Sequence, residues 1–280
     1  MTTLGILHPG SMGAAVAAQA RERGAEVLWC PEGRSAATKD RALRYGLTPV
    51  RDLGEMSRRC DIILSLCPPA NAEDVAAAVA SESFSGVYIE GNAISPARMA
   101  RISGLLLRTG TAVVDGSVIG SPPSASKTPR MYLSGPESAL ESVALLFEGT
   151  SVQTRPLAGG IGKASALKLA YSSYQKSSRM LAAVAYALAS DHGLEEELLE
   201  VAKDRTGSYL AEAAYIPKVA ARAWRWAPEM REAESALYEA GLPAELAQAS
   251  AAVMERWAMS RDRPLDLSEA LAQLHEASER

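Results

Sequence analysis

Six short apolar runs, separated by segments of helix length, constrain the fold of this chain more than any other feature. They are LGILH (4–8), EVLWC (26–30), DIILSLC (61–67), GVYIEG (86–91), AVVDGS (112–117) and RMYLSG (130–135). Apolar runs of this length between helical stretches are typical of βαβ units, whose parallel strands are buried on both faces. After Gly162 the strands stop and alanine-rich helical patterns take over. The sequence predicts an α/β domain over residues 1–160 and an all-α domain over residues 161–280.

The charge balance and the hydropathy of the chain exclude several partners. The 280 residues include 29 basic and 33 acidic side chains, a formal net charge of −4, with no long block of one sign. This distribution offers no electrostatic footprint for nucleic acid or an anionic membrane. No apolar run reaches the roughly 18 residues that cross a bilayer, and no hydrophobic signal core follows the N-terminus. We therefore expect a cytoplasmic protein whose partner is a small molecule.

The cysteines and histidines show no spacing typical of a metal site or a disulfide framework. The three cysteines, Cys30, Cys60 and Cys67, lack CxxC spacing and are odd in number, which is typical of reduced thiols. The three histidines lie far apart, without an HExxH pattern. We expect no metal site.

The first predicted strand runs into a glycine turn, HPGSMG (8–13), and a helical stretch closed by Gly24 follows. Strand, glycine turn, helix and second strand form the context of a Rossmann-type dinucleotide site, in which the pyrophosphate lies at the helix N-terminus. The second and third glycine positions of GxGxxG are occupied by Gly10 and Gly13, and the first by His8. We predict that this turn binds a dinucleotide, with the residues His8, Pro9, Gly10, Ser11, Met12 and Gly13.

The stretch PEGRS (31–35) follows the second predicted strand and bears on the choice of cofactor. A carboxylate there binds the ribose 2′-hydroxyl of NAD, whereas an arginine accommodates the 2′-phosphate of NADP. Glu32 favours NAD, and Arg34 together with Ser35 favours NADP. We predict NADP, with NAD as the alternative. A competing interpretation is that Glu32 and Arg34 are solvent-facing loop charges.

Four segments carry the motifs of one known family, in that family's order. HPGSMG resembles a GLGxMG turn, DIILSLCPP a strand that ends in a Leu-Pro pair, IEGNAISP a motif with aspartate, serine, threonine and a later proline, and DGSVIG a DAPVSG loop. With these motifs the chain resembles the β-hydroxyacid dehydrogenase superfamily, which includes 6-phosphogluconate dehydrogenase, hydroxyisobutyrate dehydrogenase and, more distantly, imine reductases.

The resemblance implies further site residues. Cys67, Pro68 and Pro69 would line the cofactor, and Asn92, which replaces the serine of its motif, would bond to the nicotinamide ribose or carboxamide. The substrate loop corresponds to Ser117, Val118, Ile119 and Gly120. Because Ile119 replaces the substrate-binding serine of the family, the usual carboxylate grip is missing, unless Ser117 or Ser121 compensates. We therefore expect a substrate other than the usual small hydroxyacids.

A long helix is predicted from Lys163 to Asp191, about 29 residues and about 43 Å, ending before Gly193. It would join the two domains. Its polar residues that recur at spacings of three and four, and so share one face, are Lys168, Tyr171, Ser172, Gln175 and Arg179.

The family resemblance places the catalytic lysine six residues after Gly162, at Lys168, as general acid and base. Tyr171 and Ser172 stand where the family has two asparagines, and their hydroxyls can still bond to substrate or share the proton transfer. Gln175 lies further along the same face, toward the substrate. The competing interpretation of this polar stripe is an ordinary solvated face.

The last hundred residues are predicted to be helical over 194–205, 208–226 with a break at Pro217, 228–240, 243–259 and 267–278. Trp226 and Met230 are candidates for the wall of the substrate cleft, although tryptophans on such a helix also pack cores and dimer interfaces. The resemblance implies a homodimer.

Together these features predict an NAD(P)-dependent oxidoreductase that transfers a hydride between nicotinamide and a carbon bearing oxygen, with Lys168 moving the proton. Imine reduction in the same cleft, with Tyr171 as proton donor, is the alternative; imine reductases usually have aspartate or tyrosine where this chain has lysine. A non-catalytic, nucleotide-binding dimeric protein is the second alternative.

Overall fold

The computed structural model describes residues 1–204, 207, 209, 212–239 and 241–275. The chain forms two compact units, Met1–Ser172 and Ser173–Arg280. The first unit extends twelve residues beyond the predicted boundary at 160, because the beginning of the long helix is bonded to the sheet of that unit.

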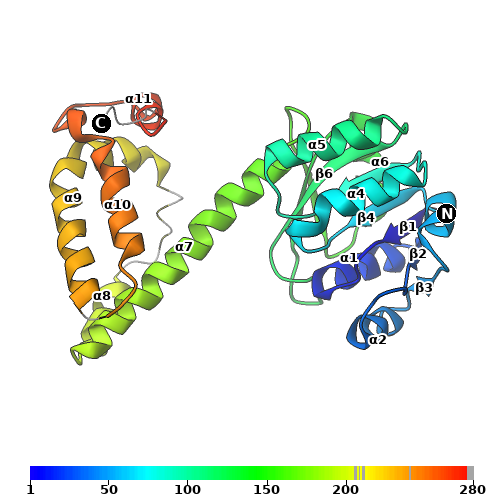
Figure 1. Ribbon diagram of the computed structural model, residues 1–280, viewed down its shortest axis with the longest axis horizontal. Helices are drawn as coiled ribbons and strands as arrows, with labels where there is room; N and C mark the ends of the chain where they lie inside the picture. Colours follow the sequence, from blue (N-terminus) through cyan, green and yellow to red (C-terminus); the bar gives the residue numbers. More distant parts are fainter. Residues whose placement is uncertain (205–206, 208, 210–211, 240, 276–280) are drawn as a thin grey trace. The chain divides into compact units, whose positions relative to one another are not determined.

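An eight-stranded sheet lies at the centre of the first unit (Figure 1). Its strands are β1 Thr3–Ile6, β2 Glu26–Trp29, β3 Thr48–Pro49, β4 Ile62–Ser65, β5 Val87–Glu90, β6 Ala112–Ile119, β7 Arg130–Ser134 and β8 Gln153–Pro156. The spatial order is β3-β2-β1-β4-β5-β6-β7-β8, and β1 to β6 are parallel. The six predicted strands and the α/β class are confirmed. β7 runs antiparallel to β6, and the short strands β3 and β8 are additions that the sequence did not predict.

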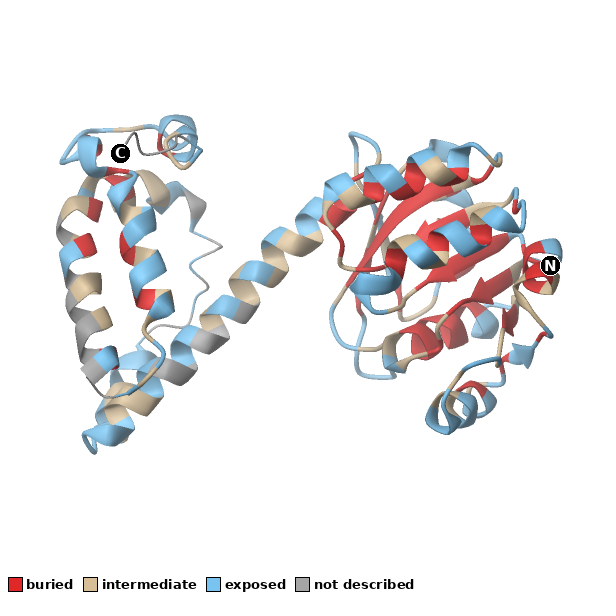
Figure 2. Cartoon of the chain, viewed as in Figure 1, coloured by how far each residue is buried: buried red, intermediate tan, exposed pale blue. Residues whose placement is uncertain are grey.

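Helices cover both faces of the sheet. α1 Ser11–Glu22, α2 Ala36–Arg44 and α6 Glu137–Phe147 pack on one face, and α3 Leu53–Arg59, α4 Ala72–Ser81 and α5 Pro96–Leu107 on the other. Successive residues of a strand serve opposite cores: Tyr88 packs with α4 and α5, and Ile89 with α1 and α6. The central strands β1, β4, β5 and β6 are consequently buried along most of their length, whereas the edge strands β3 and β8 are largely exposed (Figure 2).

The strand order reverses between β1 and β4. The chain proceeds from β1 toward β2 and β3, and from β4 toward β5 and β6 on the other side. Connections that leave two neighbouring strands in opposite directions open a crevice at their carboxyl ends, where α/β proteins bind ligands. The two strands meet there through the main-chain bond from Leu7 N to Leu64 O, 3.1 Å. The turn HPGSMG and the segment CPP both begin at this edge.

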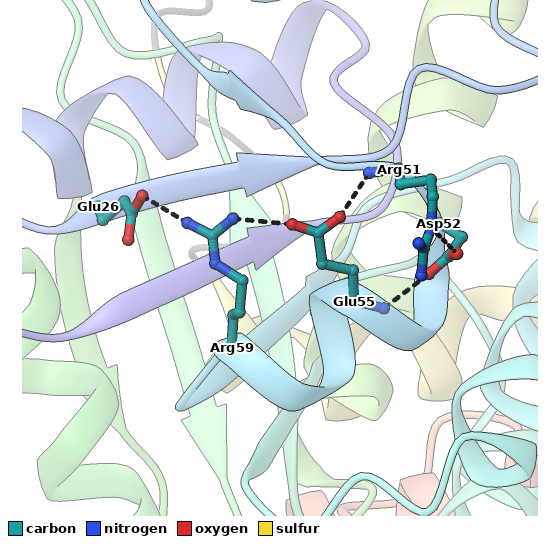
Figure 3. A network of polar contacts seen from close by, with 5 residues as sticks. All are labelled: Glu26, Arg51, Asp52, Glu55 and Arg59. Carbon is teal, nitrogen blue, oxygen red and sulfur yellow. Dashed lines mark hydrogen bonds and ion pairs between the residues drawn. The ribbon is translucent and has the colours of Figure 1, made fainter.

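A chain of charged groups joins α3 to the opposite, amino-terminal edge of the sheet (Figure 3). Arg59 donates to Glu55 at 3.0 Å and to Glu26, the first residue of β2, at 2.9 Å. Asp52 caps α3 by accepting from the main-chain N–H of Glu55 at 2.7 Å, and this bond is the main reason that its pKa lies below the ordinary value. These charges are largely solvated, so each contributes little to stability. Arg59 and Glu26 lie at the amino-terminal edge of the sheet, whereas Asp52 lies at the other end of α3, just after the carboxyl end of β3.

The long helix α7 spans Lys163–Asp191, as predicted. The helices α8 Glu195–Lys203, α9 Ile216–Glu239, α10 Glu245–Glu255 and α11 Leu267–Ala272 follow, with short 3-10 turns at Ala213–Tyr215 and Ala258–Ser260. These helices confirm the predicted all-α second unit.

Within the described residues, no helix is both long and apolar enough to cross a membrane.

The predicted interruption near Pro228 is wrong, since α9 is one continuous helix with this proline inside it. Pro228 is exposed, whereas Ala220, Ala223, Ala227 and Leu237 are buried at helical spacing on both sides of it. The apolar stripe against the rest of the unit therefore continues past the proline, at the loss of one backbone hydrogen bond. The predicted helix start at 208 lies outside the described residues.

Candidate functional site

The glycine turn after β1 has the geometry of an anion site. Gly10 is the N-cap of α1, where no side chain caps the free N–H groups. A Cβ on Gly13 would lie 2.4 Å from the carbonyl oxygen of His8, so the packing of α1 on β1 requires glycine there. A Cβ on Gly10 would meet no protein atom within 4 Å, and its φ of −69° suits any residue. Nothing in the protein itself requires glycine at position 10, which fits a ligand that approaches the backbone closely.

Basic side chains surround this turn. Arg41, on α2, donates to the carbonyl oxygen of Pro9 at 3.2 Å. The Nδ1 atom of His8 and the Nε atom of Arg34 are buried without a hydrogen-bond partner. Burial, and secondarily the charge of Arg34, lower the pKa of His8 to about 4, so its imidazole is neutral at pH 7. These two unsatisfied nitrogens lie near a turn that Arg41 also contacts, and such groups are suited to bind the oxygens of a phosphate.

The other residues predicted to bind the cofactor near this turn cap a helix, are exposed to solvent or pack against the core. Ser35 caps α2 by accepting from the main-chain N–H of Thr38 at 3.3 Å, so its hydroxyl already has a structural role. Glu32 is exposed, Ser11 is exposed, and Met12 packs against the core beside α1.

Cys67 and Asn92, predicted from separate motifs, lie together at the ends of β4 and β5. Asn92 donates through Nδ2 to the sulfur of Cys67 at 3.3 Å and to the hydroxyl of Ser65 at 3.2 Å. Burial raises the pKa of the Cys67 thiol. Pro68 and Pro69 are both exposed, and Pro69 begins a 3-10 turn before α4. All three cysteines are free, and no group of three metal-ligating side chains occurs among the residues described.

A row of buried polar residues crosses four strands at this edge, and the sequence analysis did not predict it. Ser65 on β4 is in register with Glu90 on β5, Glu90 with Asp115 on β6, and Asp115 with Ser134 on β7. All four are completely buried. The only signal in the sequence is a polar residue at or near the end of each apolar run.

Asp115 bonds the sheet to the start of α7. Its carboxylate accepts from the main-chain N–H groups of Gly162 and Ser165, both at 3.0 Å, and from the hydroxyls of Ser165 at 2.7 Å and Ser134 at 3.1 Å. A negative charge is favoured at the N-terminus of a helix by the helix dipole. Asp115 therefore fixes where α7 begins relative to β6.

One turn beyond Ser165, Lys168 reaches the carboxyl end of β6. Its ammonium group donates to the carbonyl oxygen of Val118 at 2.6 Å. The neighbouring Ser117 is buried, and its hydroxyl has no hydrogen-bond partner among the described residues. The structure thus brings Lys168 to the predicted substrate segment.

The remaining predicted residues divide between the two units. Ile119 is half-buried at the end of β6, and Gly120 turns the chain with φ +131° against Pro129. Tyr171 and Ser172 are half-buried on α7 in the first unit, and Gln175 is half-buried in the second.

Trp226 and Met230 both belong to α9. Trp226 is half-buried, and Met230 lines an apolar cavity of about 170 Å³ within the second unit, with Leu181, Leu237 and Leu246. The side chain of Arg179 lies outside the described part of the chain.

Comparison with known proteins identifies the family and the fold of this chain. Residues 3–159 match the NAD binding domain of 6-phosphogluconate dehydrogenase. This chain belongs to that family. Residues 189–257 match a domain of unknown function, DUF1932. The family resemblance predicted from the motifs is confirmed, and these matches support an NAD(P)-dependent oxidoreductase.

Several relatives cover much of the chain. An uncharacterized 28.5 kDa protein from Methanothermus fervidus is 29% identical over 182 residues, which are 65% of this chain and 69% of that protein. The conserved protein MTH1747, of unknown function and described as structurally similar to 3-hydroxyacid dehydrogenases, is 26% identical with a TM-score of 0.59, covering 98% of this chain and 100% of that one. An imine reductase from Streptomyces aurantiacus shares the fold at 17% identity, with a TM-score of 0.74 and coverage of 98% and 100%.

Proposed function

We propose that this protein is an NADP(H)-dependent oxidoreductase in which Lys168 is the general acid and base at a carbon that bears oxygen. The observation that carries the proposal is the 2.6 Å hydrogen bond from the Lys168 ammonium group to the Val118 carbonyl oxygen. This bond holds a proton donor at the carboxyl end of β6, one residue after Ser117, whose buried hydroxyl is unsatisfied. Ligands of α/β proteins bind at that end of the strands.

In this proposal, some residues of the first unit bind the cofactor and others transfer the proton. The turn from His8 to Gly13 and the N-terminus of α1 would bind the pyrophosphate, and Cys67, Pro68, Pro69 and Asn92 the nicotinamide half. When bound, the nicotinamide supplies or accepts the hydride. Lys168 Nζ donates its proton to the substrate oxygen during reduction and accepts it during oxidation. Tyr171 and Ser172, on the following turn, would orient that oxygen.

The surroundings of β1 and β2 support NADP as the cofactor. Arg34 has an unsatisfied Nε atom, and Arg41 is already held at the turn by Pro9. Two guanidinium groups suit a 2′-phosphate, and Ser35 stands at the N-terminus of α2 beside them. Glu32 is exposed; a preference for NAD would instead require its carboxylate on the ribose.

The substrate segment favours a substrate other than the usual small hydroxyacids, because Ile119 stands where the family has the serine that binds the substrate carboxylate. Ser117 offers one hydroxyl, Val118 a carbonyl that Lys168 already uses, and Ile119 an apolar side chain before Gly120. We also propose Gln175, Trp226 and Met230, all of the second unit, as substrate-binding residues. We further infer a homodimer in the cytoplasm.

A substrate panel with NADPH and NADH tests the proposal. It contains β-hydroxyacids, aldehydes, ketones and cyclic imines. For the substrate that is turned over, Lys168→Met is expected to lower kcat by about 100-fold or more, because general acid–base catalysis contributes this much, while NADPH binding is unchanged. Lys163→Met, an exposed lysine at the start of the same helix, is the matched control and keeps full activity.

Three results would contradict it. Full activity of Lys168→Met would remove the lysine from the mechanism. Turnover of cyclic imines alone, lost in Tyr171→Phe, would establish imine reduction instead. Tight NADPH binding without turnover of any compound would favour a non-catalytic nucleotide-binding protein.

A further inference from the structure

Five buried side-chain nitrogen or oxygen atoms have no hydrogen-bond partner among the described residues, and four of them lie at one edge of the sheet. These four belong to His8, Arg34, Asn92 and Ser117; the fifth belongs to Ser57, on α3. An unsatisfied buried polar atom is destabilising, so its repeated occurrence at a ligand edge indicates groups that a ligand satisfies. Of the four residues, Asn92 has the most completely defined surroundings.

Every donor of Asn92 is already used. Its main-chain N–H donates to Glu90 Oε1 at 3.1 Å, and its Nδ2 atom donates to Ser65 Oγ at 3.2 Å and to Cys67 Sγ at 3.3 Å. The side-chain oxygen Oδ1 is left buried and without a donor. The amide can therefore offer a ligand only an acceptor.

Glu90 and Ser65 hold this arrangement from within the sheet. They are in register on adjacent strands and are completely buried. Glu90 is itself held by the hydroxyl of Tyr88, which donates to its Oε2 atom at 3.2 Å. Main chain and side chain of Asn92 are thus fixed separately, one by Glu90 and the other by Ser65.

We propose that Glu90 and Ser65 are positioning residues of the cofactor site, which hold Asn92 with its side-chain oxygen ready to accept a hydrogen bond from the nicotinamide half of the dinucleotide. This inference rests on the proposed function. The donor is a ribose hydroxyl or the carboxamide NH₂ group. Neither Glu90 nor Ser65 touches the cofactor; each acts through Asn92, so loss of either loosens one half of the ligand only.

The test compares NADPH with 2′,5′-ADP, its adenosine half, by calorimetric titration of the full-length protein. Ser65→Ala removes the acceptor of the Asn92 amide, and Glu90→Met removes the acceptor of its main-chain N–H. Each is expected to weaken NADPH binding about tenfold, the effect of losing one well-placed hydrogen bond, while 2′,5′-ADP binding stays within about twofold. Glu90→Gln keeps an acceptor for the Asn92 N–H and restores NADPH binding.

Ser57→Ala is the matched control, since Ser57 is another buried serine with an unpartnered hydroxyl, away from this edge. It leaves both affinities unchanged. Unaltered NADPH affinity in Ser65→Ala and Glu90→Met, or equal weakening of 2′,5′-ADP, would overturn the inference. If Glu90→Met does not fold, Ser65→Ala decides alone. A wild-type protein that binds neither NADPH nor NADH would instead refute the proposed function, and the inference with it.

Discussion

Glu90 is a buried carboxyl group whose ionisation opposes folding. Burial is the main cause that raises its pKa from 4.5 to about 7, and the neighbouring Asp115 adds to the effect. Between these two pH values the folded protein keeps a proton that the unfolded chain has released, so stability falls as the pH rises from about 4.5 to about 7. Above this window the loss amounts to about 3 kcal/mol, at about 1.4 kcal/mol per pKa unit.

Glu90→Gln is therefore expected to gain stability relative to the wild type as the pH rises, reaching about 2 to 3 kcal/mol near pH 8 and little or nothing near pH 4.5. Urea denaturation at several pH values measures this difference. Glu141→Gln, an exposed glutamate on α6, provides the control and shows no such trend. A difference between Glu90→Gln and wild type that does not vary with pH would contradict the prediction.

The start of α1 contains one glycine that the packing of the helix requires, Gly13, and one that only a ligand would require, Gly10. Gly13→Ala is expected to destabilise the protein by about 1 to 3 kcal/mol, because the added methyl group would lie 2.4 Å from the His8 carbonyl oxygen. Gly10→Ala meets no protein atom and is expected to leave the melting temperature unchanged while it weakens dinucleotide binding. Thermal denaturation and NADPH titration of the two variants test this contrast. Equal dinucleotide affinity of wild type and Gly10→Ala would remove the turn from the binding site.

The start of α7 is held by the hydrogen bonds that the Asp115 carboxylate accepts. Asp115→Asn replaces an acceptor oxygen with an NH₂ group among N–H and O–H donors, so we expect a loss of about 3 kcal/mol from unsatisfied buried groups. The free energy of unfolding measures it, with Asp74→Asn on the exposed side of α4 as control. A wild-type value for Asp115→Asn would show that α7 is anchored by other contacts.

The two units differ in the number of large apolar side chains that they expose among the described residues. The second unit has a small buried cluster around Trp257, and many of its large apolar side chains are exposed: Leu181, Tyr186, Leu194, Leu199, Val201, Tyr209, Tyr215, Tyr238, Val253, Met259, Leu267 and Leu271. Exposed apolar surface of this extent is typical of an interface. We expect a homodimer formed through the second unit.

Light scattering after size-exclusion chromatography tests the assembly. Tyr186→Glu on α7 is expected to shift the mass toward the monomer, because it introduces a charge into the proposed interface. Leu107→Glu changes an apolar residue of the first unit that is also exposed, and leaves the mass unchanged. A monomeric wild type at micromolar concentration would be inconsistent with the dimer.

Local patterns in the chain were sufficient for the elements with strong periodicity. The six apolar runs, the glycine turn and the helix Lys163–Asp191 each depend on residues close in sequence, and all are where the sequence predicted them. β3 and β8 were not predicted, since two residues and a polar QTRP segment at the sheet edge carry no apolar signal. The continuity of α9 through Pro228 was missed because packing of its buried stripe outweighs the local preference of proline.

The fold class and the family of this chain follow from local sequence patterns alone. The three-dimensional structure is needed to see which distant residues meet: the row Ser65, Glu90, Asp115 and Ser134, the anchoring of α7, and the contact of Lys168 with Val118. Neighbours in this row are about twenty to twenty-five residues apart in the chain, and their contact depends on strand register. Periodicity reports how each strand faces its two cores, whereas register is set by the packing of all strands and helices together.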